Sequence, residues 1–515
     1  MMRRIIILSW CFFYMLNCTE LSAQFNNNYW LFGDSVGINW TTPNSPSFFN
    51  SKVRGRGTSV SLADSSGVLI YSHSNYTTFL FNQSKTYNKY HESINGSDSL
   101  YVEGWYHEML LIPHPGNDSL VYLFTIGVNS FDGLYYTLIN YKANNDSGIV
   151  IQKNIQLQNA PAFDGLTSIR HGNGRDWWLL FKNWDGIGQV GNNLTCVYLI
   201  NANGISLNST QSIGPIFSSG GGQCVFNGTN NKLVHVNWRG LILLFNFDRC
   251  TGLLSAPITI EAERSGNPYP YYFSAAFSPD DSKLYVVSIS PSNQPGQNDT
   301  LFQFDLTAPN IFTSKQVISV LPSYERTAGN LKLAPDNKIY LTSGDQTAGT
   351  PYPDTLFTAI NSYLSVINQP DSLGAACDFQ PFSFYLGGAR TYYGLPNNPD
   401  YELGAWVGSP CDTLTVSLSP NPGDPSPSEE RGAWMQAWFN HEWNMIHVNA
   451  SMLKGKSGVL RLFDVEGRVV VERKVDVIAG GYFTSEINMN GIASGVYIVS
   501  LVTEKDKVQG KVLKF

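Results

Sequence analysis

The stretch FSPDDSKLYVVS at residues 277–288 defines a pattern that recurs along the chain. An apolar run leads in through Phe273 and Ala275, a polar turn follows at 279–282, and a second apolar run leaves at 284–287. Proline presets φ at the second position of a β-turn, and Asp and Ser side chains bond to nearby backbone amides. The stretch therefore predicts a β-hairpin.

Copies of this hairpin recur at intervals of roughly 50 to 57 residues, a repeat length in the range of propeller blades. The six copies lie at 58–72, 107–124, 166–181, 223–236, 277–288 and 331–343. Further strand-like runs lie between them, at 134–141, 196–200, 241–247, 301–306 and 363–367. Two hairpin strands and one or two outer strands make a propeller blade. The sequence thus predicts an all-β fold, with a β-propeller over 25–400.

The two ends of this region supply a seventh blade. The hairpin at 29–40 has no inner strand before it, and the stretch 382–397 has no outer strands after it. Pairing these two stretches would close the ring and remove both free edges. We expect seven blades, with six as the alternative.

Composition agrees with a large β protein and argues against one class of partner. Charged residues make up only 14% of the chain and aromatic residues 13%, which favours strands over helices. The formal net charge of −7 argues against nucleic acid, because binding phosphates requires a basic surface.

The N-terminus is typical of a secretory signal peptide at 1–23. Arg3 and Arg4 precede an apolar run at 5–16, and small residues allow cleavage between Ala23 and Gln24. The apolar run is too short to span a bilayer, and no later run approaches the required length of about 20 residues. We therefore expect no transmembrane segment in the mature chain.

Five cysteines follow the predicted cleavage point: Cys196, Cys224, Cys250, Cys377 and Cys411. Export permits disulfides, but an odd number cannot pair completely within one chain. The spacings match no metal or redox motif, so we expect one or two bridges that staple loops, or buried thiols.

Four stretches of the predicted propeller resemble secreted propeller proteins of the Bacteroidota. They are YWLFGDSVGINW (29–40), SLADSSGVLIYS (61–72), LTSIRHGNGRDWWLLF (166–181) and CDFQPFSFYLGGARTYYGLPN (377–397). The resemblance implies a surface-exposed propeller of unassigned function, and it carries over no catalytic residue.

A change in composition marks a second region after the propeller. Residues 401–457 are expected to form a linker and an insert, with a sorting region that starts near 415, and 458–515 a small β-sandwich. This tail resembles the type A C-terminal sorting domain of the type IX secretion system. The residues that carry the resemblance are Pro420, Asn421, Pro422, Asp464, Gly467, Gly495, Val496, Tyr497, Lys511 and Lys514.

The resemblance of the tail implies a route and a partner. It implies Sec export, passage across the outer membrane by the type IX machinery, and removal of the tail on release or surface attachment. We therefore expect the protein outside the cell or on the outer-membrane surface.

Patterns that suggest catalysis or metal binding are incomplete. HEMLL at 107–111 lacks a second His four residues on, and HEWNMIH at 441–447 places its two His residues six apart. Asp64, Asp118, Asp176, Asp280 and Asp336 lie in or beside hairpin turns and are expected to cap them. No catalytic, cofactor-binding or metal-ligating residue is therefore predicted, and no cofactor.

Two surface features remain as hypotheses. Trp105–Tyr106, Trp177–Trp178, Trp184, Trp238 and residues 269–272 could stack on a ligand, although packing between blades explains most of them. The triplet Asp-Ser/Thr-Leu resembles the O-glycosylation acceptor of exported Bacteroidota proteins, although it is equally explained as the way these loops enter strands. The acceptors would be Ser99, Ser119, Thr300, Thr355, Ser372 and Thr413.

The sequence thus favours a non-catalytic extracellular propeller that binds a glycan or a protein. The alternative is a secreted carbohydrate-active enzyme with carboxylates at the propeller mouth.

Overall fold

The protein forms two compact units, Met1–Thr415 and Val416–Phe515. The computed structural model describes residues 25–74, 84–127, 133–160, 162–184, 191–264, 271–289, 298–321, 328–344, 357–412, 434–440, 444–451, 457–464, 467–476 and 483–514. The predicted signal peptide and its cleavage residues, Ala23 and Gln24, lie outside these ranges.

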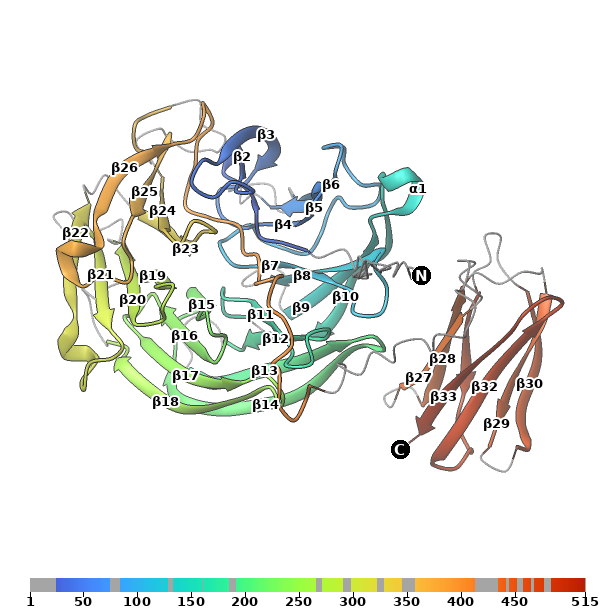
Figure 1. The fold of residues 1–515 in the computed structure, drawn as a ribbon. Coiled ribbons are helices and arrows are strands. Elements are labelled where there is room, and N and C mark those ends of the chain that lie inside the picture. The colour runs from blue at the N-terminus through green and yellow to red at the C-terminus, as the bar shows by residue number, and fades with distance from the viewer. Residues whose placement is uncertain are drawn as a thin grey trace, which may run out of the picture. The chain divides into compact units, whose positions relative to one another are not determined.

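Seven antiparallel sheets build the first unit, each from strands that follow one another in the chain (Figure 1). The first two are β1 (Tyr29–Phe32), β2 (Asp34–Asn39), β3 (Ser47–Arg54) and β4 (Ser59–Asp64), β5 (Gly67–His73), β6 (Lys85–Asn88). The third and fourth are β7 (Met109–Pro113), β8 (Leu120–Gly127), β9 (Gly133–Asn140), β10 (Ile149–Gln158) and β11 (Thr167–Arg170), β12 (Trp177–Lys182), β13 (Asn192–Asn201), β14 (Gly204–Phe217).

The remaining three sheets complete the ring. They are β15 (Gly222–Phe226), β16 (Lys232–Asn237), β17 (Ile242–Asp248), β18 (Leu253–Glu261); β19 (Tyr271–Phe277), β20 (Lys283–Ile289), β21 (Asp299–Asp305), β22 (Gln316–Leu321); and β23 (Ala328–Leu333), β24 (Ile339–Ser343), β25 (Tyr363–Ile367), β26 (Phe379–Tyr385). Figure 1 shows the sheets arranged radially, with β7, β11, β15, β19 and β23 nearest the centre. The expected all-β propeller with seven blades is confirmed.

The six predicted hairpins form the two innermost strands of blades two to seven. Strands β12 (WWLLFK) and β20 (KLYVVSI) are buried at every position. Such runs lack alternation because neighbouring blades cover both faces of each sheet. Helices are short: α1 (Ala143–Asp146), η1 (Phe312–Ser314) and η3 (Gly374–Cys377). None of the helices in the described ranges has the length and hydropathy to cross a membrane.

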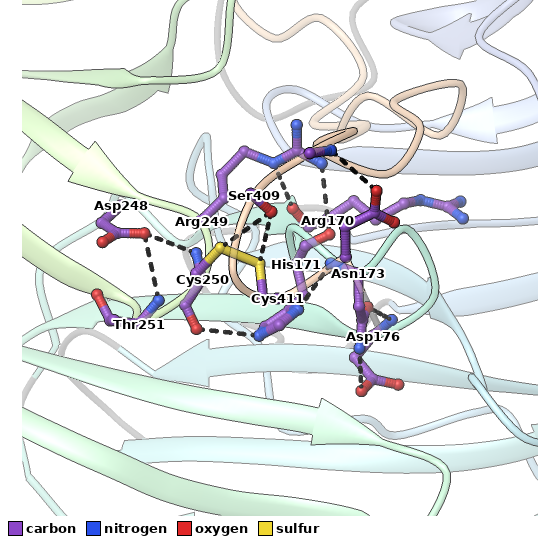
Figure 2. Close-up of a disulfide and its surroundings, with 12 residues drawn as sticks. Arg170, His171, Asn173, Asp176, Asp248, Arg249, Cys250, Thr251, Ser409 and Cys411 are labelled. Atoms are coloured by element: carbon purple, nitrogen blue, oxygen red, sulfur yellow. Dashed lines mark hydrogen bonds between the residues drawn. A yellow bond between two sulfur atoms is a disulfide. The ribbon is translucent and has the colours of Figure 1, made fainter. Parts of the chain in front are cut away.

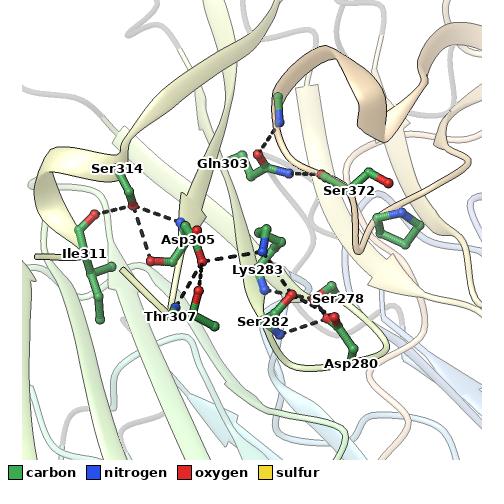
Figure 3. A network of polar contacts seen from close by, with 12 residues as sticks. Ser278, Asp280, Ser282, Lys283, Gln303, Asp305, Thr307, Ile311, Ser314 and Ser372 are labelled. Carbon is green, nitrogen blue, oxygen red and sulfur yellow. Dashed lines mark hydrogen bonds and ion pairs between the residues drawn. The ribbon is translucent and has the colours of Figure 1, made fainter. Parts of the chain in front are cut away.

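The turn between β19 and β20 contains two acidic residues, and Figure 3 shows the contacts of Asp280. The Ser278 hydroxyl donates to Asp280 at 2.7 Å, and the backbone and hydroxyl of Ser282 donate at 2.9 and 2.8 Å. Burial raises the pKa of Asp280, but these bonds outweigh it and the pKa is lowered. Asp281 instead accepts the Gly228 N–H of the preceding blade at 2.8 Å. Both carboxylates therefore hold turns.

The other predicted turn caps divide into two groups. Asp64 and Asp336 accept backbone N–H groups two residues on, as predicted. Asp118 and Asp176 instead form ion pairs with a lysine and an arginine. Neighbouring asparagines, Asn117 and Asn173, cap those two turns.

Residues 390–401, here called the closing segment, join the last blade to the first. Asp34 and Arg390 form an isolated antiparallel bridge, and the Arg390 guanidinium contacts the Asp34 carboxylate at 2.9 Å. Asn397 donates to backbone oxygens of Ser59, Met109 and Leu166 at 2.9 to 3.0 Å. The segment thus lies beside the innermost strands of the second and third blades.

The predicted pairing of 382–397 with 29–40 is only partly correct. Residues up to Tyr385 form β26, the outermost strand of the last blade, and Arg390 alone pairs with the first hairpin. The rest of the closing segment forms no strand: the Tyr393 and Gly394 N–H groups donate to Arg56 O, and the Asn330 N–H donates to Tyr393 O, as separate backbone hydrogen bonds.

Residues 402–412, here called the strap, follow the closing segment and are fixed to the fourth and fifth blades (Figure 2). The Arg249 guanidinium donates to Gly404 O at 2.6 Å, and Trp406 N donates to Gly172 O at 2.7 Å. A disulfide joins Cys250 to Cys411. The three other cysteines of the described residues, Cys196, Cys224 and Cys377, are free and buried. One stapling bridge and buried thiols are both present, as expected.

The second unit is a small β-sandwich of two sheets around its own core. One sheet has β27 (Trp434–Asn440), β28 (Met445–Ser451) and β31 (Phe483–Asn488), and the other has β29 (Ser457–Phe463), β30 (Val469–Asp476), β32 (Gly495–Thr503) and β33 (Lys507–Lys514). The sandwich therefore starts before residue 458, since β27 and β28 lie inside the predicted 401–457 linker and insert. In β28 the buried residues Ile446 and Val448 alternate with polar residues, as in a strand with one buried face. The strand is short and has polar residues on both sides, so this alternation is hard to recognise in the sequence.

The disulfide is expected to stabilise the propeller strongly. Its cysteines are 161 residues apart, and closing a loop of this length removes about 5 kcal/mol of unfolded-state entropy in the chain-entropy model. Cys411→Ser should therefore lower the free energy of unfolding by about 2–5 kcal/mol in denaturant titrations. The double variant Cys250→Ser/Cys411→Ser is the control and should lose no more than the single one. An unchanged denaturation midpoint in Cys411→Ser would contradict a stabilising role of the disulfide.

Candidate functional site

Six aromatic residues gather at the end of the ring where the innermost strands begin, and we call this cluster the aromatic mouth. It consists of Trp105, Tyr106, Trp238, Tyr271, Phe273 and Tyr393. Trp105 and Tyr106 precede β7, Trp238 follows β16, Tyr271 and Phe273 begin β19, and Tyr393 belongs to the closing segment. Residues from three blades and from the closing segment are thus brought together.

Tyr106 is the centre of the mouth. Its ring lies 4.5 Å from Phe273, 6.1 Å from Tyr393 and 6.3 Å from Trp238, all edge-to-face. Tyr106, Phe273 and Tyr393 are buried, whereas Trp105, Trp238 and Tyr271 are partly exposed. The buried rings form a floor, and the partly exposed rings present apolar surface above it.

A run of glycines seats two tryptophan rings against the backbone. A Cβ at Gly220 would lie 2.7 Å from the Trp184 ring, and one at Gly221 would lie 2.5 Å from the Trp238 ring. Only glycine permits so close an approach. The Trp238 indole N–H is buried and has no hydrogen-bond partner within the described residues. Trp184 itself is nearly buried and donates to Ser218 O.

Two buried carboxylates hold the loop that carries Trp105. The backbone amides of residues 103, 104 and 105 donate to Glu108 Oε2 at 2.7 to 3.1 Å. The next two amides, of residues 106 and 107, donate to Asp164 at 3.3 and 2.8 Å. Five consecutive N–H groups are thus satisfied by two side chains, which fixes the Trp105 backbone.

Burial and mutual repulsion act against the charges of this pair. Burial raises the pKa of Asp164 to about 7, against the lowering effect of the amides. Burial, with Asp164 beside it, also raises the pKa of Glu108 well above its usual value. Two negative charges close together in a site without water repel each other, so the two carboxyl groups together retain a proton near neutral pH.

His107 joins three blades rather than binding a metal. Its Nε2 accepts from the Asn330 amide at 2.8 Å, and its Nδ1 donates to Gly222 O at 3.1 Å. Burial lowers the pKa of His107 to about 3, so the ring is neutral and this tautomer satisfies both nitrogens. Among the residues that the structure describes, no group of three or more His, Cys, Asp or Glu side chains could hold a metal ion.

The predicted stacking residues separate by burial. Trp177, Trp178 and Tyr272 lie in the core, Trp184 is nearly buried, and residues 269–270 lie outside the described ranges. Trp105, Trp238 and Tyr271 remain partly exposed. Sequence reasoning missed Tyr393 and the Glu108–Asp164 pair; the only available signal was an acidic residue directly before an apolar strand.

The predicted sorting residues are spread over the sandwich. Asp464 accepts the Arg468 N–H at 3.0 Å across a turn where Gly467 has φ +80°. Lys514 donates to Met489 O and Ile492 O at 2.9 and 2.6 Å. These residues hold turns and strand ends.

The other sorting residues lie in strands β32 and β33 or outside the described residues. Gly495 and Val496 begin β32, and the Tyr497 hydroxyl donates to Ala493 O at 2.7 Å. Lys511 lies in β33 opposite Ile498. Pro420, Asn421 and Pro422 lie outside the described residues.

The predicted glycosylation acceptors do not converge on one site. Ser99 is exposed, and Ser119, Thr300 and Ser372 are partly exposed; Ser99 and Ser119 lie beside the third blade, Thr300 in the sixth and Ser372 in the seventh. Thr355 and Thr413 lie outside the described residues.

Comparison with known proteins identifies the tail. A family model described as a secretion system C-terminal sorting domain matches residues 442–514. This match includes β28 to β33, the strands from Met445 onward. No curated protein matches the chain.

Solved structures similar to the chain include three propeller-like proteins at low identity. A putative 6-phosphogluconolactonase from Bacteroides fragilis is 12% identical, with a TM-score of 0.42, over 73% of this chain and 96% of that one. The Cps50 (Swd1) β-propeller domain of Myceliophteria thermophila is 10% identical, with a TM-score of 0.31, over 62% and 93%. The Bacteroides ovatus xyloglucan PUL GH43B protein is 14% identical, with a TM-score of 0.29, over 78% and 88%. Nothing about function follows from likenesses this distant.

The seven radial sheets and the matched tail together define the protein. It is a β-propeller protein with a secretion system C-terminal sorting domain, sent by type IX secretion to the cell surface or the extracellular space.

Proposed function

We propose that the propeller is a non-catalytic module that binds a glycan at the aromatic mouth. The observation that carries the proposal is the group of three partly exposed rings, Trp105, Trp238 and Tyr271, above a buried aromatic floor. Apolar faces of sugar rings stack on such side chains.

The neighbouring carboxylates favour binding over hydrolysis. Glu108 and Asp164 are buried beneath the loop and accept its amides, so they serve to position Trp105. Glu103 accepts the Trp105 indole N–H at 3.1 Å and orients that ring. A glycosidase would need two carboxylates free to face the sugar. These contacts therefore support the alternative, a secreted carbohydrate-active enzyme, less well than a binding module.

We also infer that the chain comes from a member of the Bacteroidota and that its tail is of type A. The order of the Pro-Asn-Pro, Asp464–Gly467 and Gly495–Tyr497 marks supports this inference. The signal peptide at 1–23 and O-glycosylation at Asp-Ser/Thr-Leu are part of the same proposal. The exposure of Ser99 supports modification there.

Replacing a rim tryptophan should weaken glycan binding. The ligand for this test is the neutral hexasaccharide that binds most tightly in a panel of glucose, mannose, xylose and galactose oligomers. Trp105→Ala or Trp238→Ala should lower the affinity for it by about fivefold to tenfold, because the stacking face is lost. Calorimetric titration measures this. Trp406→Ala is the matched control, because Trp406 is 47% exposed but lies on the strap. Equal loss in the control, or sugar turnover abolished by Glu103→Gln, would contradict the proposal.

The buried carboxylate pair predicts a pH dependence of stability. The raised pKa of Asp164 means that the folded state keeps a proton which the unfolded state releases. The free energy of unfolding should therefore fall as the pH rises from about 4 to about 7. Denaturant titrations of Asp164→Asn should show a shallower fall, whereas Asp64→Asn, at an exposed turn, should keep the original slope. An identical slope in Asp164→Asn would argue against a retained proton.

The inferred processing can be checked by mass. Expressed in a Bacteroidota host with type IX secretion, the protein recovered outside the cell should lack residues 1–23 and the tail and should exceed the bare polypeptide mass by glycan increments. Ser99→Ala should remove one increment, whereas Ser45→Ala, outside any Asp-Ser/Thr-Leu triplet, should not. A mass equal to the bare polypeptide would remove the glycosylation proposal.

A further inference from the structure

A second candidate binding site lies where the first and last blades meet, and none of the described residues that line it belongs to the aromatic mouth. It is a pocket of about 350 Å³ between β2, β3 and the residues just before the closing segment. Its lining includes Asp34, Ser35, Lys52, Arg54, Phe357 and Gly388. A volume of this size accommodates one or two sugar units.

The pocket is locally cationic in an acidic protein. Among the residues that the structure describes, Asp34 is the only acidic one in the lining, and it is neutralised by Arg390, whose Nη2 lies 2.9 Å from its Oδ2. Lys52 and Arg54 are exposed and form no ion pair with any residue that the structure describes. Two uncompensated positive charges therefore line this pocket, although the chain carries a formal net charge of −7. Such a local field selects anions.

An aromatic ring flanks the same pocket. The Phe357 side chain is 55% exposed, and the Arg390 guanidinium lies 4.6 Å from its ring centroid. One face of the ring is thus covered by a cation that is itself buried, which leaves the other face for a ligand.

The backbone shapes an open pocket before any ligand binds. Ser35 has φ +66°, a left-handed conformation that is strained for a non-glycine residue. A Cβ at Gly388 would meet nothing nearer than 3.9 Å, so this glycine lines open space. Strain of this kind is common at binding sites.

We propose that this pocket binds a uronate unit of an acidic polysaccharide. The planar guanidinium of Arg54 matches the two oxygens of a carboxylate, Lys52 adds a point charge, and the exposed Phe357 face stacks on the pyranose ring. The exposed Asn50 amide supplies a donor and an acceptor for sugar hydroxyls. An inorganic anion would leave Phe357 unused, and an acidic peptide would present no ring to it.

The test compares tetragalacturonate with its fully methyl-esterified form, using the purified full-length chain and calorimetric titration at low salt. The acid should bind at least about tenfold more tightly than the ester, because esterification removes the charge. Arg54→Gln should weaken binding of the acid by about tenfold, and Phe357→Ala should weaken it by about fivefold. Added salt should weaken it too.

Control variants separate this site from the aromatic mouth. Lys338→Gln removes a cation from the turn between β23 and β24, outside the pocket lining, and should leave tetragalacturonate binding unchanged. Trp105→Ala should also leave it unchanged, so failure at the mouth does not decide this proposal. Equal affinity for acid and ester, an unaffected Arg54→Gln variant, or tighter binding of poly-L-glutamate would each overturn it.

Discussion

Asn397 connects three parts of the ring. Its side-chain amide donates to the backbone oxygens of Met109 and Leu166, and its backbone N–H donates to Ser59 O. Blades contact only their neighbours, so a propeller is stable only when the first and last are joined. Here that joint has one antiparallel bridge, at Asp34 and Arg390, together with single backbone and side-chain hydrogen bonds made by residues 391–397. Closure is thus a matter of specific residues rather than of strand propensity.

This dependence explains why the sequence predicted the blades well and their junction less well. A hairpin is local: proline, acidic and serine residues within four positions determine the turn, as around Asp280. The junction joins residues more than 350 positions apart, and its prolines hide it from any strand pattern. The number of blades was predictable from spacing, whereas the way residues 386–401 close the ring was predicted only in part.

The same distinction applies to the candidate sites. Trp105 and Trp238 could be singled out as aromatic residues, but burial decided which rings remain accessible. Glu108 and Asp164 are separated by a whole blade in sequence, and no local pattern predicts that they share one loop. Because the five amides are already satisfied, the loop is ordered before a ligand arrives, which lowers the entropic cost of binding. Burying the Glu108 and Asp164 carboxyl groups away from water costs free energy, and this cost accompanies the order of the loop.

The disulfide has a consequence for how closure of the ring can be recognised in the folded protein. Cys250 belongs to the fifth blade and Cys411 to the strap, which directly follows the closing segment. Cys196, Cys224 and Cys377 are buried in the folded ring. Buried thiols reach neither an oxidant nor one another, so geometry selects the native pair. In the folded protein the bridge is therefore a covalent marker of a closed ring.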